Sequence, residues 1–313
     1  MPEGRQPRGT GFALRDALPW TDLVGVVRAA EASGYGALFL PEITGRDALV
    51  SLGSLAGETR DLHLGTGVVP MRSRTLLLLA MGAATVQERS GGRLVLGLGT
   101  GAAATGALDE LRENVLALRG LLSGDGFERR GERVRLALDP GSPVPIWIAA
   151  LGPKAMHLAG EVADGVLLNW CPPERVAFAR GRVGEGAVAA GRDPDEIAIG
   201  VYVRAWAGGD DSTAMPALKE AAAQYASYRA YARQFQDVGL GPEAEVAARA
   251  HHVGRTDQVP ENLVRAVCAV GADAADRVSA YREAGADLPV VYPVSVGDPV
   301  ASIERTLLAL APG

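Results

Sequence analysis

The sequence is poor in cysteine and has no dense run of basic residues. Cys171 and Cys268 are its only cysteines, and no CxxC spacing is present, so neither a disulfide framework nor a thiolate zinc site is indicated. We expect both to be small buried residues, and no metal site is predicted. A net charge of −6 without a Lys/Arg cluster argues against nucleic acid or an acidic membrane surface as the main partner.

Long apolar runs are also lacking. The longest, Leu76 to Ala84, is about half of the ~20 residues that a bilayer span requires. The first residues, MPEGRQPRGTG, contain no apolar segment of the kind found in signal peptides. We therefore predict a cytoplasmic protein that does not act in a membrane.

What the sequence does contain is enough apolar residues for one large core. Hydrophobic residues make up 48% of the 313 positions and charged residues 22%. No Pro/Ser-rich linker or break in composition divides the chain. We predict a single domain over residues 1–313.

Strand-like and helix-like segments alternate along the chain, which is typical of βα units around a parallel sheet. Eight such units favour a closed (β/α)8 TIM barrel over an open doubly wound sheet. The predicted strands are Gly11–Leu14, Ala37–Leu40, Leu62–Val69, Leu94–Leu98, Pro145–Ala149, Gly165–Asn169, Ile197–Ala205 and Leu288–Tyr292.

Two segments interrupt this alternation. Residues Phe127–Leu138 predict a short hairpin that turns at Arg130 and Gly131. Strands 7 and 8 are separated by more residues than one crossover needs, which predicts a helical excursion. Its expected helices are Ala214–Asp237, Pro242–Ala250 and Pro260–Ala269, ahead of a regular helix at Ala274–Ala284.

An aromatic stripe lies within the excursion at near-helical spacing. It consists of Tyr225, Tyr228, Tyr231 and Phe235. Such a stripe is typical of a helix core, but an excursion at this end of a barrel also commonly shapes a substrate pocket. Both interpretations, core and lid, remain open from the sequence.

Three predicted strands end in glycine turns that open onto helices. They are LHLGTGVVP at Leu62–Pro70, RLVLGLGTG at Arg93–Gly101 and PIWIAALGPK at Pro145–Lys154. Glycine has no Cβ, so backbone at such turns can approach a flat or phosphorylated ligand closely. If the strands are parallel neighbours, these turns lie at the end of the barrel where α/β enzymes bind ligands.

The individual turns allow more than one interpretation. GLGTGAAA at Gly97–Ala104 matches a GxGxxA dinucleotide fingerprint, but tight strand-to-helix packing alone would also explain its glycines. Gly152 and Pro153 begin a helix whose free N–H groups, with Lys154 beside them, make an anion site. On that helix His157 and Glu161 are spaced to share a solvated face rather than to act in catalysis.

Longer segments resemble the bacterial-luciferase-like family, and most closely its deazaflavin-dependent branch that includes methylenetetrahydromethanopterin reductase. The resemblance is carried by LGTGVVP at Leu64–Pro70, ERSGGRLVLGLGTG at Glu88–Gly101 and IAALGPKAMHLAGEVADGVLLN at Ile148–Asn169. A weaker match is VPENLVRAVCAVGADAADRVSAYREAGAD near the C-terminus.

This resemblance implies a barrel that binds coenzyme F420, or alternatively FMN, with the ring against a bulge in strand 3. A non-prolyl cis peptide is implied between Gly67 and Val68. The strand 4 glycines would border the polar side of the cofactor, and the turn after strand 5 would meet its phosphate. The cofactor-binding residues so implied are Thr66, Gly67, Val68, Gly99, Thr100, Gly101, Ala150, Gly152, Pro153 and Lys154. Relatives are often dimers, so we expect a homodimer.

The sequence departs from the family at two points. Several relatives carry Asp-His after strand 2, where this chain has Pro41-Glu42, and some carry an acidic residue where it has Ala102. Glu42 remains the best catalytic candidate because it follows a strand end facing the expected mouth. It could equally be an ion-pair partner for Arg46 or Arg72.

These observations favour an oxidoreductase that transfers a hydride between coenzyme F420 and a small organic substrate. The alternative within the same fold is an FMN-dependent monooxygenase. A third hypothesis is a non-catalytic flavin-binding barrel, which the two departures from the family pattern would explain.

Overall fold

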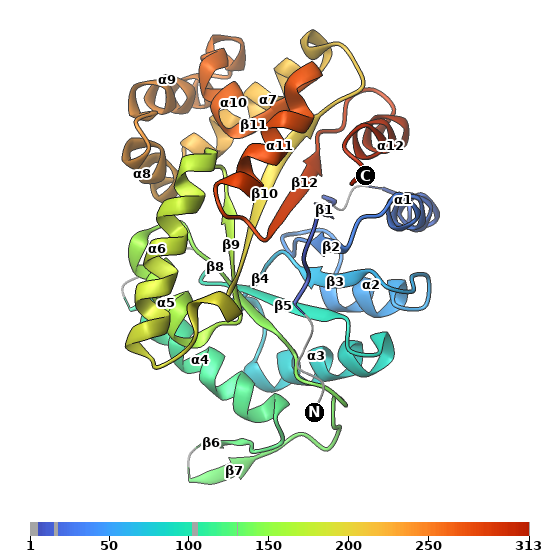
Figure 1. Ribbon diagram of the computed structural model, residues 1–313, viewed down its shortest axis with the longest axis vertical. Coiled ribbons are helices and arrows are strands. Elements are labelled where there is room, and N and C mark those ends of the chain that lie inside the picture. The colour runs from blue at the N-terminus through green and yellow to red at the C-terminus, as the bar shows by residue number, and fades with distance from the viewer. Residues whose placement is uncertain (1–5, 16–17, 102–105, 130, 313) are drawn as a thin grey trace.

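The computed structural model describes residues 6–15, 18–101, 106–129 and 131–312. Eight parallel strands close into a barrel that is ringed by helices, which confirms the predicted TIM barrel (Figure 1). Pairing runs from β1 through β2, β3, β5, β8, β9, β10 and β12 back to β1. The barrel strands are β1 (Gly11–Ala13), β2 (Ala37–Leu40), β3 (His63–Thr66) with its continuation β4 (Val69–Pro70), β5 (Leu94–Gly99), β8 (Ile146–Ala149), β9 (Gly165–Asn169), β10 (Ala198–Trp206) and β12 (Leu288–Pro293).

Each barrel strand is followed by at least one helix of the outer ring. The helices of this ring are α1 (Trp20–Ala32), α2 (Ala48–Leu55), α3 (Leu76–Ser90), α4 (Ala107–Leu122), α5 (Pro153–Val162), α6 (Pro173–Ala189), α11 (Ala274–Glu283) and α12 (Pro299–Ala309). Asp47 caps the amino end of α2, since its side chain accepts a hydrogen bond from the Val50 N–H at 3.0 Å. Short 3₁₀ turns are η1 (Met71–Ser73), η2 (Pro194–Glu196), η3 (Thr256–Gln258) and η4 (Gly271–Asp273).

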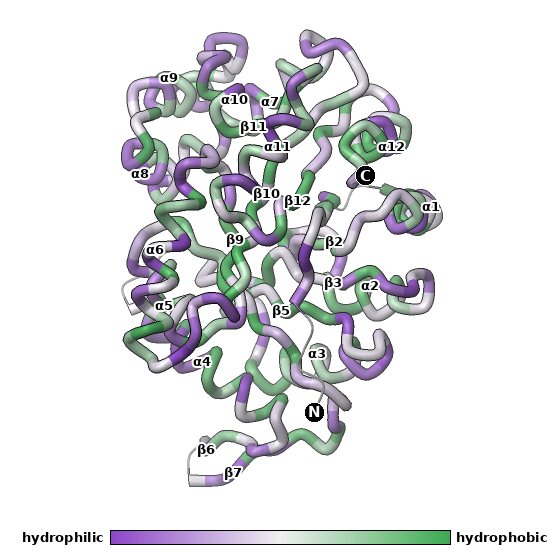
Figure 2. The backbone as a smooth tube through the Cα atoms, viewed as in Figure 1, coloured by the Kyte–Doolittle hydropathy of each residue, from purple (hydrophilic) through white to green (hydrophobic). Residues whose placement is uncertain are grey.

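Aromatic side chains fill the inside of the barrel. Phe39, Trp147 and Tyr202 belong to a buried cluster with Val68 packed against it. Room for the indole of Trp147 comes from Gly165, where a Cβ would lie 2.4 Å from the ring. Hydrophobic residues concentrate in strands such as β9, while the outer turns of the helices are hydrophilic (Figure 2). The barrel is therefore a packed core, and a ligand must bind at one of its ends.

The hairpin and the excursion both appear where the sequence places them. β6 (Phe127–Arg129) pairs antiparallel with β7 (Glu132–Val134), and Arg130 of the predicted turn lies outside the described residues. The excursion contains α7 (Asp211–Ala226), α8 (Arg229–Asp237), α9 (Gly241–His252), α10 (Glu261–Val267) and β11 (Cys268–Val270), grouped at one side of the barrel in Figure 1.

Three predicted elements need correction. The helix expected over Ala214–Asp237 is two helices, because Tyr228 adopts an extended conformation and its N–H closes a turn on the Tyr225 carbonyl. The helix expected over Pro260–Ala269 ends at Val267, since residues 268–270 pair with the end of β10 as β11. The third predicted strand is interrupted between β3 and β4.

No helix in the described part of the chain is long and apolar enough to cross a membrane.

Candidate active site at the barrel mouth

The carboxyl ends of the barrel strands form the mouth, and the interruption between β3 and β4 lies there. The peptide bond between Gly67 and Val68 is cis, as the resemblance implies. The bulge is held to β2 by hydrogen bonds from Gly67 N–H to the Leu40 carbonyl at 2.8 Å and from Glu42 N–H to the Val68 carbonyl at 3.4 Å. On the barrel side the Tyr202 hydroxyl donates to the Gly67 carbonyl at 3.2 Å. A Cβ on Gly67 would lie 1.7 Å from that hydroxyl, so only glycine fits.

The Thr66 hydroxyl forms hydrogen bonds within the barrel wall, to the backbone of β5. The Oγ1 atom donates to the Gly97 carbonyl and accepts from the Gly97 N–H, both at 2.8 Å, and the residue is fully buried. A Cβ at Gly97 would lie 2.1 Å from the Thr66 carbonyl oxygen, and one at Gly99 would lie 2.9 Å from Val68. Two glycines of the fingerprint-like turn therefore let β5 pack closely against the bulge. Because β5 lies within a closed barrel, the dinucleotide-binding interpretation is wrong.

Only part of the turn after β5 lies within the described residues. Thr100 is half-buried, and its Oγ1 lies 3.4 Å from the Gly101 carbonyl. Gly101 is exposed and adopts a left-handed conformation, with φ of 71°. Ala102, one of the departures from the family pattern, lies outside the described residues.

The amino end of α5 is open at the same end of the barrel. Gly152 caps α5 without a side-chain hydrogen bond, Pro153 follows it, and Lys154 is exposed. A Cβ on Gly152 would have no atom within 4 Å, so space remains in front of the helix. Ala150, by contrast, is buried beneath the turn. Free N–H groups, the helix dipole and one cation thus combine at this point, as an anion site requires.

His157 on the same helix pairs with Glu161 rather than with a group of the mouth. Its Nε2 lies 3.3 Å from Glu161 Oε1, and Glu161 also pairs with Arg112. His251 and His252 are exposed at the end of α9. The described residues contain no group of three or more His, Cys, Asp or Glu placed to hold a metal ion.

Glu42 forms an ion pair with Arg74, which is neither of the two partners, Arg46 and Arg72, that the sequence suggested. Arg74 donates from Nε to Glu42 Oε1 at 2.9 Å and from Nη2 to Oε2 at 2.7 Å. The Ala48 N–H also donates to Oε2, at 3.2 Å. Hydrogen bonding to Glu42 raises the pKa of Arg74 against the effect of burial, and Asp47 adds to the rise. The carboxylate is therefore fixed in one orientation beside the bulge.

The sequence interpretation missed a buried cation at the mouth. Arg204 lies near the carboxyl end of β10 and is only 8% exposed. Four aromatic rings surround its guanidinium carbon, with ring centroids at 3.8 Å for Tyr292, 5.1 Å for Trp170, 5.7 Å for Tyr225 and 5.9 Å for Tyr202. We call these five residues the Arg204 cage. A charged residue inside the otherwise apolar strand AIGVYVRAW was the available signal.

The aromatic stripe of the excursion contributes to this cage. Phe235 is fully buried, and Tyr228 is 47% exposed. Tyr225 packs on Trp170 at 4.9 Å between centroids, and Tyr231 accepts a hydrogen bond from Asn169 at 2.9 Å. The stripe is thus partly core and partly wall of the mouth.

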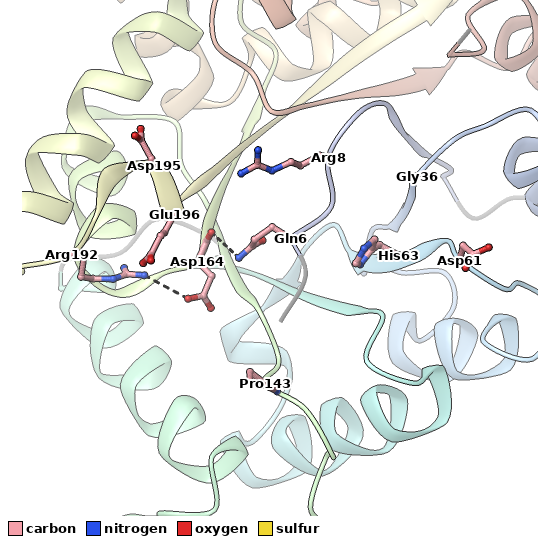
Figure 3. A pocket seen from close by; sticks show the side chains of 10 residues that line it. All are labelled: Gln6, Arg8, Gly36, Asp61, His63, Pro143, Asp164, Arg192, Asp195 and Glu196. Atoms are coloured by element: carbon pink, nitrogen blue, oxygen red, sulfur yellow. Dashed lines mark hydrogen bonds and ion pairs between the residues drawn. The ribbon is translucent and has the colours of Figure 1, made fainter. Parts of the chain in front are cut away.

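A cleft with a volume of about 870 Å³ lies at the other end of the barrel (Figure 3). One of its charged groups, Asp164, is fully engaged: it binds Arg119 at 3.0 Å and the Ile146 N–H at 2.8 Å, and pairs with Arg192 at 3.6 Å. Gln6 crosses this end, accepting from Trp147 Nε1 and donating to the Asp164 carbonyl. TIM-barrel enzymes have their active sites at the carboxyl ends of the strands, so we place the candidate site at the mouth instead.

The chain is similar in sequence to known proteins. Residues 5–288 match the luciferase-like monooxygenase family. Over 199 residues the chain is 34% identical to 5,10-methylenetetrahydromethanopterin reductase of Methanolobus tindarius, covering 59% of this chain and 61% of that protein. The matched part thus spans about three fifths of the curated reductase.

Two solved structures show the same fold. The coenzyme F420-dependent tetrahydromethanopterin reductase of Methanopyrus kandleri superposes with a TM-score of 0.79 at 21% identity, covering 98% of this chain and 99% of that one. The oxygenating constituent of 3,6-diketocamphane monooxygenase from Pseudomonas putida, in complex with FMN, has a TM-score of 0.67 at 18% identity, covering 97% and 96%. On the extent of the family match, the chain belongs to the luciferase-like monooxygenase family.

Proposed function

We propose that this protein is an oxidoreductase that transfers a hydride between coenzyme F420 and a small organic substrate. The observation that carries the proposal is the meeting, at one barrel end, of the Gly67–Val68 bulge, the glycine end of β5 and the open amino end of α5. Membership of the family and the likeness to a methylenetetrahydromethanopterin reductase support it.

The mouth suits a flat ring with a phosphorylated tail. Val68 offers an apolar surface, and beside it lie Gly99 at the end of β5 and Thr100 and Gly101 in the turn that follows. Gly152, Pro153 and Lys154 would take the phosphate, with Thr66 and Ala150 supporting the strand ends from below. Bound there, coenzyme F420 would supply a ring carbon that gives or accepts the hydride. The protein's part is to position the ring and substrate and to exclude water.

Glu42 is proposed as the carboxylate that orients the substrate or moves a proton. Replacing Glu42 with Gln keeps the shape but removes the charge beside Arg74. A catalytic role predicts a kcat reduced by about 10²-fold or more with F420 affinity retained. A purely structural role predicts instead a lowered melting temperature and an unchanged kcat. Arg72→Gln is the matched control, because Arg72 pairs with Glu110 on the exterior at 2.9 Å and its side chain is half exposed.

The cofactor is tested by mass spectrometry of what co-purifies and by titrating the protein with F420 and FMN. We expect F420 to bind more tightly. Recovery of FMN, or tighter FMN binding, would favour the monooxygenase alternative, which the FMN-bound structural neighbour motivates. Failure of bound F420 to exchange a hydride with any donor or acceptor would support the non-catalytic alternative.

Three further predictions concern the whole protein. We propose that residues 1–313 act as one domain, that two chains form a homodimer, and that the protein is cytoplasmic. Light scattering coupled to size-exclusion chromatography tests the dimer: a mass near the 32.5 kDa of one chain would contradict it.

A further inference from the structure

Arg204, at the centre of the Arg204 cage, is a buried cation with no counter-charge among the described residues. The guanidinium stacks on Tyr292 at 3.8 Å, and its one hydrogen bond to a described residue runs from Nη1 to Asn169 Oδ1 at 3.3 Å. No carboxylate of the described residues forms an ion pair with it, whereas the comparably buried Arg175 pairs with Asp237. Burying a charge without a counter-charge is costly, so an unpaired arginine in this position needs an explanation.

The surroundings of Arg204 hold it in one orientation. Asn169 accepts from Arg204 and donates to the Tyr231 hydroxyl at 2.9 Å. Gln234 of α8 donates to the carbonyls of Asn169 and Trp170 at 2.9 and 2.8 Å. These two hydrogen bonds from Gln234 fix the turn in which Trp170 adopts a positive φ of 52°. Elements from both the barrel and the excursion thus aim the guanidinium.

Other groups here also favour a bound anion. Burial raises the pKa of Tyr292, while Arg204 and Arg15 act to lower it, so two positive charges act on this part of the mouth. The indole Nε1 of Trp170 is buried and has no acceptor among the described residues. Trp170 Nε1 is therefore a buried donor beside Arg204 that an acceptor on a ligand would satisfy.

We propose that Arg204 binds a carboxylate of the substrate, so that the substrate is a small organic acid. Stacking on Tyr292 occupies a face of the guanidinium, and Nη1 bonds to Asn169, so Nε and Nη2 remain to meet a planar carboxylate in a bidentate pair. The rings of Trp170 and Tyr225 would border the apolar remainder of the acid. The inference deepens the proposed function and rests on it for the identity of the bound acid as substrate.

The test measures binding without turnover, so it does not depend on finding the substrate. Benzoate, hexanoate, neutral benzamide and phenyl phosphate are titrated into wild-type protein by calorimetry, with and without F420. We expect the two carboxylates to bind and benzamide to bind at least about tenfold more weakly, because it lacks the charge. Tighter binding of phenyl phosphate than of benzoate would overturn the carboxylate assignment.

Two variants locate the effect. Arg204→Met should weaken benzoate by about tenfold or more, and Asn169→Asp should do the same by placing a carboxylate beside Arg204 with almost no change in volume. The second variant keeps the proposal testable if the first does not fold. Arg119→Met, at the opposite end of the barrel, is the matched control and should bind benzoate as wild type does. Equal benzoate binding by wild type and both cage variants, or none by wild type, would overturn the proposal.

F420 affinity, measured in the same proteins by fluorescence, separates this inference from the proposed function. Retained F420 binding in Arg204→Met with lost benzoate binding supports the substrate role. Lost F420 binding with unchanged benzoate binding would assign Arg204 to the cofactor and overturn it. If wild type binds no F420 but binds benzoate through Arg204, the proposed function fails while the carboxylate site stands.

Discussion

The two ends of the barrel treat charge in opposite ways. At the amino-terminal end Asp164 is matched by Arg119 and Arg192, and Asp287 by Arg180 at 2.6 Å. At the mouth Arg204 has aromatic rings and an amide oxygen in place of a carboxylate. Glu42, paired with Arg74, and Asp237, paired with Arg175, are exceptions there. The difference fits the proposal that a ligand binds at the mouth, whereas the charges at the other end stabilise the fold.

The largest effect on the contrast between the two ends is expected at the Gly67–Val68 bulge. Gly67→Val should raise the dissociation constant for F420 by about 100-fold or more, because the new side chain must displace the Tyr202 hydroxyl that lies 1.7 Å from the Cβ position. Circular dichroism should show a folded barrel. Binding is measured by quenching of F420 fluorescence, and affinity equal to that of wild type would remove the bulge from the cofactor site.

Gly25→Ala is the matched control for this substitution. Gly25 lies in α1 with nothing within 4 Å of its Cβ position. The change should leave F420 affinity alone and stabilise the fold by about 0.5–1 kcal/mol, since alanine favours a helix more than glycine does.

At the opposite end the expected effect is on stability and not on binding. Asp164→Ala should lower the free energy of unfolding by about 2–3 kcal/mol, because it leaves the Ile146 N–H without an acceptor and removes the counter-charge of Arg119 and Arg192. Urea unfolding measures the loss, and F420 titration should match wild type. Asp61→Ala, in the same cleft but exposed, should change stability by less than about 0.5 kcal/mol. A large loss of F420 affinity in Asp164→Ala would contradict the view that this end of the barrel affects stability and not binding.

The sequence predicted the architecture well because periodicity and glycine turns are local signals. The strand Gly165–Asn169 was predicted with its observed bounds, and the glycine turns lie at the mouth as expected. The break at Tyr228 was missed because the near-helical spacing of the aromatic stripe continues across it. The strand β11 was missed because it depends on pairing with the end of β10, which is distant in the sequence.

The site was predictable in its backbone but not in its side-chain partners. Glycines reveal close approaches of the chain, so Gly67 could be placed from the sequence. The choice of Arg74 as partner for Glu42 could not, because several arginines lie at similar sequence distances from it. Arg204 was visible as a charge in an apolar strand, yet its ring of aromatic residues comes from the turn after β9 and from α7, β10 and β12, which only the fold brings together.

A smaller effect is expected at the open end of α5. Lys154→Ala should weaken F420 binding by roughly threefold to fivefold at low salt, since it removes one exposed cation from an anion site. The difference should shrink as salt is added. The chain's only other lysine, Lys219 in α7, provides the control, and Lys219→Ala should not change the affinity. Equal affinities for Lys154→Ala and wild type at low salt would place the phosphate elsewhere.

The smallest expected effect concerns the two thiols behind the mouth, where we expect almost no reaction. Burial raises the pKa of Cys171 to about 12 and that of Cys268 to about 12, and the opposing charges of Arg175 and Arg204 do not offset it. Because the thiolate is the reactive form, only about 10⁻⁴ of each thiol is ionised at pH 8. Ellman's reagent should therefore detect no thiol in the native protein between pH 7 and 9, and both thiols in denaturant. Rapid labelling of Cys268 in the native state would show that water reaches the strand behind Arg204, and that this end of the barrel is not the dry, aromatic-lined site described above.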